Sequence, residues 1–418
     1  MEETALPDPA PRPPEESTGT VWPVLSPDAL YGLAGDVVRT IGPHTEADPA
    51  ALLMQFLTAI GNVLGRDLYA TAEDARHGLN LNVVLVGDSS KGRKGTSWAR
   101  IKSLISRTDD RWSRKQIVSG LSSGEGLIER FEYIDEDDNV NDKRLLVVQS
   151  EFASVLKVME RPGNTLSPVI RDLWDCLEVI QTLTRKKNKL YTTNPHLSII
   201  AHITLDELLK QLCETETMNG FANRFLLVLV KRSRCLPEGS SIPEDELHTL
   251  AEQMCKVVTA WKGREQRFKR DDKARELWAQ DYERLSEGKP GLFGAATNRA
   301  EAQVLRISCI YPALDCSAVV RIDHLNAALA VWDYCQQSAA LIFGDATGDS
   351  VADKILNALV IGDLTRNEIR ESVFQRNMPA ARIDIALRML LKSGRITVRR
   401  EETEGRPVEI FSLVRGTR

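Results

Sequence analysis

The segment from Gly87 to Ser97, GDSSKGRKGTS, holds the residue types that bind phosphate groups. The phosphates of ATP need backbone N–H donors at a helix N-terminus, a lysine for the outer phosphates and a hydroxyl for Mg²⁺. We assign the lysine role to Lys94 and the hydroxyl role to Thr96 or Ser97. The residues predicted to contact ATP and Mg²⁺ are Gly87, Ser90, Gly92, Arg93, Lys94, Gly95, Thr96 and Ser97.

The spacing of this segment departs from the usual phosphate loop, G-x-x-x-x-G-K-[ST]. Arg93 stands before Lys94, and a further glycine follows the lysine. A basic surface loop is therefore the alternative interpretation. The flanking pattern favours the phosphate loop, because an apolar β-branched run (81–86, LNVVLV) precedes it and a helical stretch (98–105) follows it.

Hydrolysis of ATP needs a carboxylate near the phosphates, and Glu151 is the candidate. It follows the apolar run 145–149 in the sequence LLVVQSEF. Gln149 and Ser150 occupy the positions where an aspartate is usual, so either Glu151 serves both carboxylate roles or hydrolysis is slow. We predict that Glu151 is the catalytic acid and, with Thr96, a Mg²⁺ ligand. The alternative is that Glu151 only opens the next helix, where an acid favours the helix dipole.

His202 ends another apolar run, LSIIAHI, and is predicted to sense the γ-phosphate from the tip of a core strand. A histidine that simply satisfies its hydrogen bonds at a strand end is the alternative. Thr204 and Glu207 follow it at the spacing of a capping box, which predicts that a helix begins there.

Arg224, in NGFANRF, is the third predicted catalytic residue. It lies beside an apolar strand and is expected to reach the γ-phosphate of a neighbouring subunit, as an arginine finger does. Charges that flank a buried strand only for solubility are the alternative. The sequence also suggests that Arg299 and Arg306, seven residues apart on one helical face, sense the nucleotide.

Two basic regions are predicted to contact nucleic acid. The first is a cluster of four cations in TRKKNKLY, which suits phosphate contacts but is also typical of a solvated loop: Arg185, Lys186, Lys187 and Lys189. The second is the segment 351–418, which has 13 Lys and Arg against 9 Asp and Glu in a chain whose net charge is -5. Its helix 380–393 and the following hairpin predict a winged helix, in which these cations face DNA: Arg382, Arg388, Arg399 and Arg400.

The elements around these residues predict an α/β protein with a P-loop NTPase core and a mainly parallel sheet, since apolar runs alternate with helices. We expect five regions in chain order. They are a disordered Pro-rich tail (1–25), an N-terminal helical cap (26–75), the P-loop core (76–243), an all-α lid (244–345) and a winged-helix module (350–418).

The composition indicates what class of protein this is and where it is expected to act. With 42% hydrophobic and 27% charged residues, the chain is typical of globular proteins, and any DNA contact must be a local patch. The 7 cysteines show no C-x-x-C spacing, which argues against a zinc ribbon. No apolar run approaches the roughly 20 residues that cross a bilayer. We therefore expect a cytoplasmic protein with no membrane contact.

Several separated blocks together resemble a family of helicase-like P-loop ATPases of phage, prophage and plasmid replication modules, with a core like that of RecA and AAA+ proteins. The blocks are VGDSSKGRKGTS, GLSSGEGLI, HLSIIAHITLDEL, NGFANRFLLVLVKRS, RISCIYPALD and AALAVWDYC. The resemblance implies that Lys94 and Thr96 bind ATP and Mg²⁺, that Glu151 is the catalytic acid, and that His202 and Arg224 complete the site. It also implies a ring on DNA and a primase partner.

The function expected from these features is that of an ATP-driven, helicase-like DNA motor, acting as a hexamer on single-stranded or forked DNA. Two alternatives stay open. One is a nucleotide-gated replication initiator or helicase loader that unwinds little by itself. The other is a defence or regulatory ATPase of a mobile element.

Overall fold

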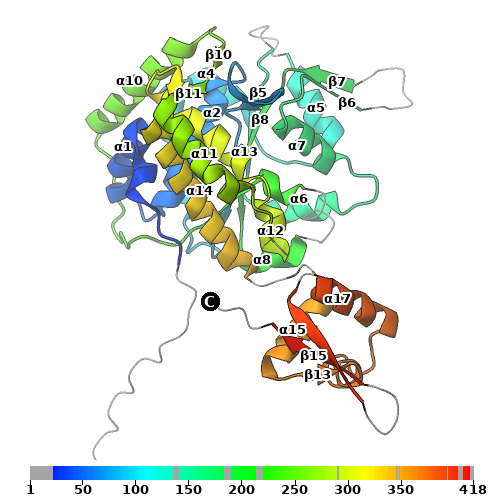
Figure 1. Ribbon diagram of the computed structural model, residues 1–418. Coiled ribbons are helices and arrows are strands. Elements are labelled where there is room, and N and C mark those ends of the chain that lie inside the picture. Colours follow the sequence, from blue (N-terminus) through cyan, green and yellow to red (C-terminus); the bar gives the residue numbers. More distant parts are fainter. Residues whose placement is uncertain are drawn as a thin grey trace, which may run out of the picture.

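A sheet of five parallel strands forms the centre of the main body (Figure 1). This computed structural model describes residues 22–134, 141–182, 190–212, 220–289, 291–344, 347, 349–392, 394–402 and 408–414. The strands stand in the order β4 (Ile117–Val118), β5 (Arg144–Gln149), β8 (His196–Ile203), β3 (Asn82–Val86) and β9 (Leu226–Leu229). The predicted α/β class and the parallel sheet are confirmed; β4 was not predicted.

The central strands are buried on both faces, which explains their continuous apolar sequences. Every residue of β3 and of β8 is buried. In β3, Val83 and Leu85 enter one hydrophobic core while Val84 and Val86 enter a second, because side chains alternate along a strand. The sheet is therefore covered by helices on each side.

The first face is covered by helix α2 (Pro49–Leu64), which differs from the predicted N-terminal cap. Asp48 caps it by accepting from the N–H of Ala50, and 14 of its 16 residues are buried. Asn62 donates to the main-chain oxygens of Leu145 (3.0 Å) and His196 (3.3 Å), on β5 and β8. Because nearly all of α2 is buried, the helix belongs to the hydrophobic core that covers this face of the sheet. On the same side lie η1 (Pro27–Leu30), α1 (Gly32–Ile41), η2 (Gly42–His44), α3 (Lys94–Ser106) and α4 (Asp110–Lys115).

The second face is covered by shorter helices from the middle of the chain. These are α5 (Gly124–Glu132), α6 (Phe152–Met159), α7 (Leu166–Trp174), α8 (Leu205–Gln211) and η3 (Ala222–Arg224). The strands β6 (Val179–Thr182) and β7 (Leu190–Thr193) pair in antiparallel fashion beside them. The loops that follow β3, β5 and β8 all emerge at the carboxyl edge of the sheet.

The helices after Pro243 share the main core instead of forming a subdomain of their own. They are α10 (Glu244–Trp261), α11 (Asp272–Ser286), α12 (Gly291–Thr297), α13 (Ala300–Leu314) and α14 (Ile322–Phe343). Tyr334 of α14 donates to the main-chain oxygen of Leu229 at 2.7 Å, and Ser338 accepts from the N–H of Leu229 at 3.2 Å. All of α13 except Glu301 is buried. Helix α14 therefore extends the structure beside the outer strand β9.

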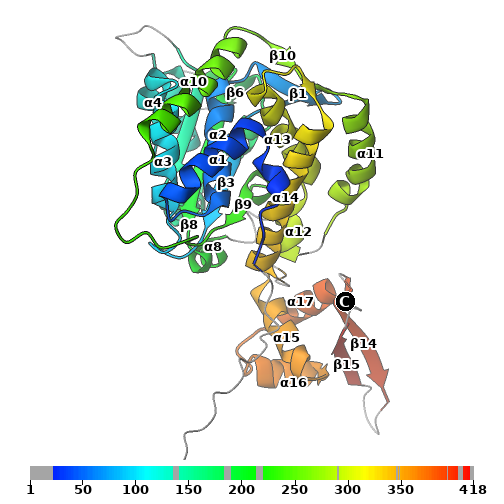
Figure 2. The same ribbon diagram turned by 90° about the vertical axis from the view of Figure 1, so that its left-hand side faces the viewer.

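Five short strands, none of them predicted, lie near α13. Strand β1 (Leu68–Ala72) pairs in antiparallel fashion with β2 (Ala75–Gly78) and in parallel with β10 (Gln266–Arg267). Strand β11 (Lys269–Arg270) pairs in parallel with β12 (Val319–Val320). The segment 262–270 thus connects two small sheets at the end of the body away from α8 (Figures 1 and 2).

The C-terminal residues form a small body with its own hydrophobic core. In order it contains α15 (Ser350–Ile361), β13 (Leu364–Thr365), α16 (Arg366–Glu368), η4 (Ile369–Val373), α17 (Ala380–Lys392), β14 (Ile396–Glu401) and β15 (Val408–Leu413). Its strands form an antiparallel sheet in the order β13-β15-β14. Ile355, Leu387 and Phe411 lie at the centre of its core. We call residues 349–414 the C-terminal module.

Candidate nucleotide site

The segment Gly87–Ser97 runs from the carboxyl end of β3 into the first turn of α3. The order of strand, turn and helix is as predicted, but α3 begins at Lys94, earlier than the predicted stretch 98–105. Lys94 is that first helical residue, and its side chain curls back over the end of the strand. Its Nζ donates to the main-chain oxygen of Gly87 and, at 3.2 Å, to that of Asp88. The ammonium group is therefore held at the start of the loop, close to the helix N-terminus.

The backbone of the loop takes a strained shape at two residues. Ser90 has φ of 54° and Arg93 has φ of 50°, in the left-handed region that residues other than glycine seldom adopt. The turn at Arg93 absorbs the extra residue in the spacing, so that Lys94 still begins the helix. No side chain caps this end of α3 in the part of the chain that the structure describes. The first N–H groups of the helix therefore remain available to an anion.

The two candidate hydroxyls have different surroundings. Ser97 is fully buried, and its Oγ donates to the main-chain oxygen of Lys94 at 2.7 Å. Thr96 is exposed in the first turn of α3. Of the two residues, only Thr96 is exposed to solvent at the start of the helix.

Arg93 forms an ion pair with a carboxylate in this structure, and its predicted contact with the nucleotide stays a prediction. Its Nη2 lies 2.5 Å from Oε2 of Glu46, and Arg232 lies 3.6 Å from the same oxygen. Glu46 also accepts from the N–H of Leu236 at 2.8 Å. This cluster ties the loop to the segment before α2 and to the segment after β9.

The glycines of the loop are needed for different reasons. A Cβ on Gly87 would lie 2.3 Å from the main-chain oxygen of Val230, whereas a Cβ on Gly95 would meet no atom within 4 Å. We expect Gly87→Ala to lower the free energy of unfolding by about 1–3 kcal/mol, because the backbone must shift. Gly95→Ala should leave it unchanged or slightly higher. Chemical denaturation of the two variants measures this, and equal stabilities would show that the close approach at Gly87 is unimportant.

His202 lies below the loop, on β8. It is buried, and its Nε2 accepts from the Nε2 amide of Gln55 on α2 at 3.1 Å. Gln55 also donates to the main-chain oxygen of Lys94 at 3.4 Å. Burial, and then the charge of Lys94, lower the pKa of His202 to about 4. The neutral histidine on β8 thus holds Gln55 of α2, and Gln55 in turn bonds to the first residue of α3. This chain of hydrogen bonds positions the start of α3, where the loop ends.

This burial predicts a stability that depends on pH. In the unfolded chain His202 has its ordinary pKa of 6.5, so the unfolded state binds more protons between pH 6.5 and about 4. The free energy of unfolding should therefore fall as the pH falls through that range, by on the order of 3 kcal/mol for this group. Denaturation curves at several pH values test this. His202→Asn should flatten the dependence, and an unchanged slope in that variant would contradict the assignment.

Glu151 lies at the same edge of the sheet as the loop, but not on the neighbouring strand. Strand β8 separates β5 from β3, so two interstrand steps of about 4.8 Å each lie between them. Glu151 is exposed at the N-terminus of α6, and its side chain makes no capping hydrogen bond. Gln149 holds this turn, since it accepts from Gly120 N–H (3.1 Å) and donates to the main-chain oxygen of Glu151 (3.3 Å).

A second acid near Lys94 was predicted only as a helix cap. Glu207 forms the capping box of α8 with Thr204, directly after β8, the strand next to β3. Burial lowers the pKa of Lys94, while the charges of Asp88 and Glu207 raise it. The charge of Glu207 therefore acts on Lys94. Glu207 follows β8, which is next to β3, whereas Glu151 follows β5, which is one strand further from β3.

Arg224 is at the amino end of the strands, opposite the end at which the loop of its own chain lies. It precedes β9, whose residue Leu226 pairs with Val83 near the start of β3. At roughly 3.3 Å per residue, Arg224 is about 20 Å from the loop along the strands. Its side chain is buried and lies 2.5 Å from the carboxylate of Asp175. Burial and the pairing with Asp175 give Arg224 a structural role in this chain, and its predicted contact with a neighbouring subunit stays a prediction.

Arg299 and Arg306 also lie at the amino end of the strands, away from the loop of their own chain, so they do not sense a nucleotide bound there. Arg299 lies 3.3 Å from the carboxylate of Asp175. Arg306 is fully buried and donates to the side-chain oxygen of Asn80 at 2.5 Å and to the main-chain oxygen of Trp174 at 2.6 Å. Both arginines hold the fold together where β3 begins.

The predicted nucleic-acid contacts fall in two places. Arg185, Lys186, Lys187 and Lys189 lie outside the described residues. In the C-terminal module, Arg382 lies 2.8 Å from the buried carboxylate of Asp349, and its side chain is 34% exposed. The other three cations are exposed, although two of them also approach acids of the module: Arg388, Arg399 and Arg400.

Comparison with known proteins adds no relative: no protein-family model matches the chain, and no curated protein matches it. Within the described ranges, no helix has the length and apolar character to cross a membrane. The same residues contain no cluster of three or more His, Cys, Asp or Glu side chains that could bind a metal ion. A Mg²⁺ ion at the loop would therefore depend on Thr96, on a single acid and on the phosphates themselves.

Proposed function

We propose that the chain is a P-loop ATPase that binds ATP and Mg²⁺ at the segment Gly87–Ser97. The observation that carries the proposal is the position of Lys94. Its ammonium group lies over the carboxyl end of β3, beside the uncapped N-terminus of α3. A cation and free N–H groups at one strand-to-helix turn suit the β- and γ-phosphates of a nucleotide.

Different residues at the loop bind the phosphates, bind the metal and hold the helix in place. Lys94 and the first N–H groups of α3 bind the phosphates, and Thr96 supplies the exposed hydroxyl for the metal. Mg²⁺, when bound, neutralises charge on the outer phosphates. Gln55 and His202 hold the start of α3 from below. Glu151 orients and deprotonates the attacking water. Because β8 lies between β5, which Glu151 follows, and β3, which the loop follows, there is room for the γ-phosphate and that water between them.

We further propose that this ATPase acts on DNA, as a hexameric ring and with a primase partner. The order of elements in the C-terminal module (helix, strand, two short helices, helix, hairpin) supports a winged helix, with α17 as the recognition helix. Arg388 on α17 and Arg399 and Arg400 on β14 face solvent and are suited to phosphate contacts. The helices after Pro243 would carry nucleotide-dependent motion to this module through α14.

One observation favours the alternative of an initiator or loader with little turnover. Gln149, at the usual aspartate position, is engaged with Gly120 and with the backbone of Glu151, so it offers no carboxylate to the metal. The site then binds ATP well and hydrolyses it slowly.

ATP turnover with and without single-stranded DNA, combined with a strand-displacement assay on a fork, tests the proposal. A motor should show turnover that DNA stimulates, together with displacement. Nucleotide-dependent DNA binding with negligible turnover would favour the initiator or loader. If DNA affects neither nucleotide binding nor turnover, the result favours a defence or regulatory ATPase.

A further inference from the structure

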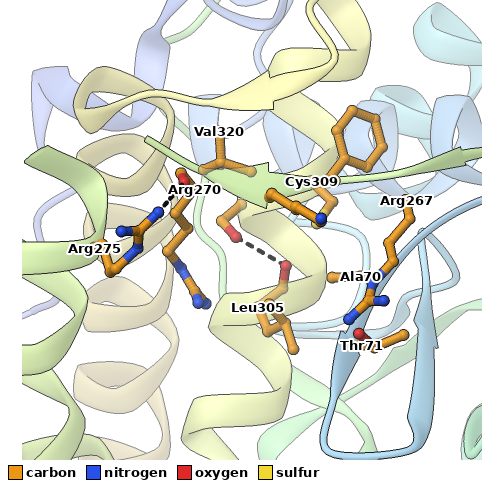
Figure 3. Close-up of a pocket in the computed structure, with 11 residues that line it drawn as sticks. Ala70, Thr71, Arg267, Arg270, Arg275, Leu305, Cys309 and Val320 are labelled. Carbon is orange, nitrogen blue, oxygen red and sulfur yellow. Dashed lines mark hydrogen bonds between the residues drawn. The ribbon is translucent and has the colours of Figure 1, made fainter. Parts of the chain in front are cut away.

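A second polar cavity lies far from the loop, at the end of the body where β1 and β10 meet α13 (Figure 3). Its volume is about 260 Å³. Figures 1 and 2 place β10 at the opposite end of the body from α8, which follows the carboxyl end of β8. The cavity is therefore separate from the candidate nucleotide site.

The lining of this cavity is strongly basic. Arg267, Lys269 and Arg270 all line it, and none has an acidic partner within 4 Å in the ranges that the structure covers. Arg275 also lines it, paired at 3.0 Å with Asp272 and donating at 3.4 Å to the main-chain oxygen of Arg270. The cavity thus holds three positive charges that no protein carboxylate balances.

Arg270 has two side-chain nitrogen atoms that lack hydrogen-bond partners. Its Nε and Nη2 atoms are buried and make no hydrogen bond. Its guanidinium is held in place over the ring of Trp278, 3.9 Å from the ring centre. The nearby thiol of Cys309 supplies no negative charge, because burial raises its pKa to about 12. An unpaired buried guanidinium is costly, so the arrangement is best explained by an anion that completes it.

Thr71 adds a hydroxyl on the other side of the cavity. Its Oγ1 is buried and has no hydrogen-bond partner either. Figure 3 shows the side chains of Arg270 and Arg267 on either side of Leu305 and Ala70, with Thr71 below Arg267. Two guanidinium groups, a lysine and a hydroxyl around a small space form the donor set that suits a tetrahedral oxyanion.

We propose that this cavity binds a phosphate group, free or as part of a polynucleotide backbone. The segment 262–270, KGREQRFKR, leads to it and carries further exposed cations at Lys262 and Arg264. Arg270 and Thr71 hold the phosphate oxygens from inside, and Arg267 and Lys269 lie at the entrance. The proposal is independent of the nucleotide site, because none of these residues belongs to the loop.

The test measures binding of inorganic phosphate by ³¹P NMR titration in low-salt buffer. The parent protein carries Lys94→Ala, which keeps the loop from contributing. We expect Arg270→Gln to weaken phosphate binding about tenfold or more, since it removes charge-assisted hydrogen bonds. Thr71→Val, which keeps the shape of the side chain, should weaken it severalfold. Arg264→Gln, in the same segment but outside the cavity, is the matched control and should bind as the parent does.

The source of the phosphate is distinguished by a single-stranded oligonucleotide without terminal phosphates. If it displaces inorganic phosphate from the parent, and binds more weakly to Arg270→Gln, the ligand is the polynucleotide backbone. If it does neither, the ligand is a free phosphate group. The proposal is overturned if the parent binds no phosphate at millimolar concentration, or if Thr71→Val and a folded Arg270→Gln both bind it as the parent does.

Discussion

Replacing Lys94 with alanine is expected to weaken ATP binding by roughly one to two orders of magnitude. The change removes the ammonium group that lies beside the helix N-terminus, and hydrogen bonds from a charged donor contribute about 1.5–3 kcal/mol each. The fold should survive, since Lys94 bonds only to main-chain oxygens of its own loop. Calorimetric titration with a non-hydrolysable ATP analogue and Mg²⁺ measures the loss.

Lys91 provides the matched control for this experiment. It is an exposed lysine of the same loop, three residues before Lys94. Lys91→Ala changes the charge of the loop by the same amount but removes no group near the end of β3. If the two variants lost affinity equally, the loop would act only as a diffuse positive patch, and the specific role of Lys94 would be wrong.

The second large effect is expected for Glu151→Gln, which should lower the rate of ATP turnover by about a hundredfold to a thousandfold. The amide keeps the size of the side chain but cannot accept a proton from the attacking water. Binding of ATP should change little, because the side chain of Glu151 makes no capping hydrogen bond to α6 that the substitution would break. Steady-state turnover and analogue binding, measured on the same preparation, separate the two properties.

Glu160→Gln is the control for that comparison, since Glu160 is an exposed acid at the other end of α6. Turnover that is unaffected in Glu151→Gln would remove Glu151 from the chemistry. Glu207, in the first turn of α8 directly after β8, would then be the acid to examine. Its capping box with Thr204 means that Glu207→Gln also tests the stability of α8.

Much of the core could be predicted because its strands are short β-branched runs between helices. The predicted runs at 81–86, 145–149 and 197–203 (LSIIAHI) each match a strand to within one residue at either end. The interpretation of α2 as a cap was wrong because Gln55, Thr58 and Asn62 stand at i, i+3 and i+7, a polar stripe that is typical of a helix facing solvent. The structure buries all three, and Gln55 and Asn62 form hydrogen bonds to α3 and to strands of the sheet instead of to water.

The position of Arg224 follows from the chain order. A residue that precedes a parallel strand lies at the amino end of the strands, whereas the phosphate loop follows its strand and lies at the carboxyl end. Arg224 precedes β9, so it does not reach the loop of its own chain. Its predicted contact with the γ-phosphate of a neighbouring subunit stays a prediction.

Other parts of both sites could not be predicted from the sequence. Gln55 meets His202 across 147 residues of chain, and Glu46 meets Arg93 only because α2 packs beside α3. The phosphate cavity draws Thr71, Arg270 and Cys309 from three separate segments. The cations of 262–270 were visible in the sequence, but nothing local indicated that Arg270 would be partly buried without a partner.

A crystal structure of the full chain with an ATP analogue and Mg²⁺ tests the central claim most directly. The account predicts that the β- and γ-phosphates lie at the N-terminus of α3, within hydrogen-bond distance of Lys94 Nζ, with the hydroxyl of Thr96 toward the metal. Lys94 should then have turned from the oxygens of Gly87 and Asp88 toward the phosphates. A nucleotide bound elsewhere, with Lys94 still on those main-chain oxygens, would contradict it.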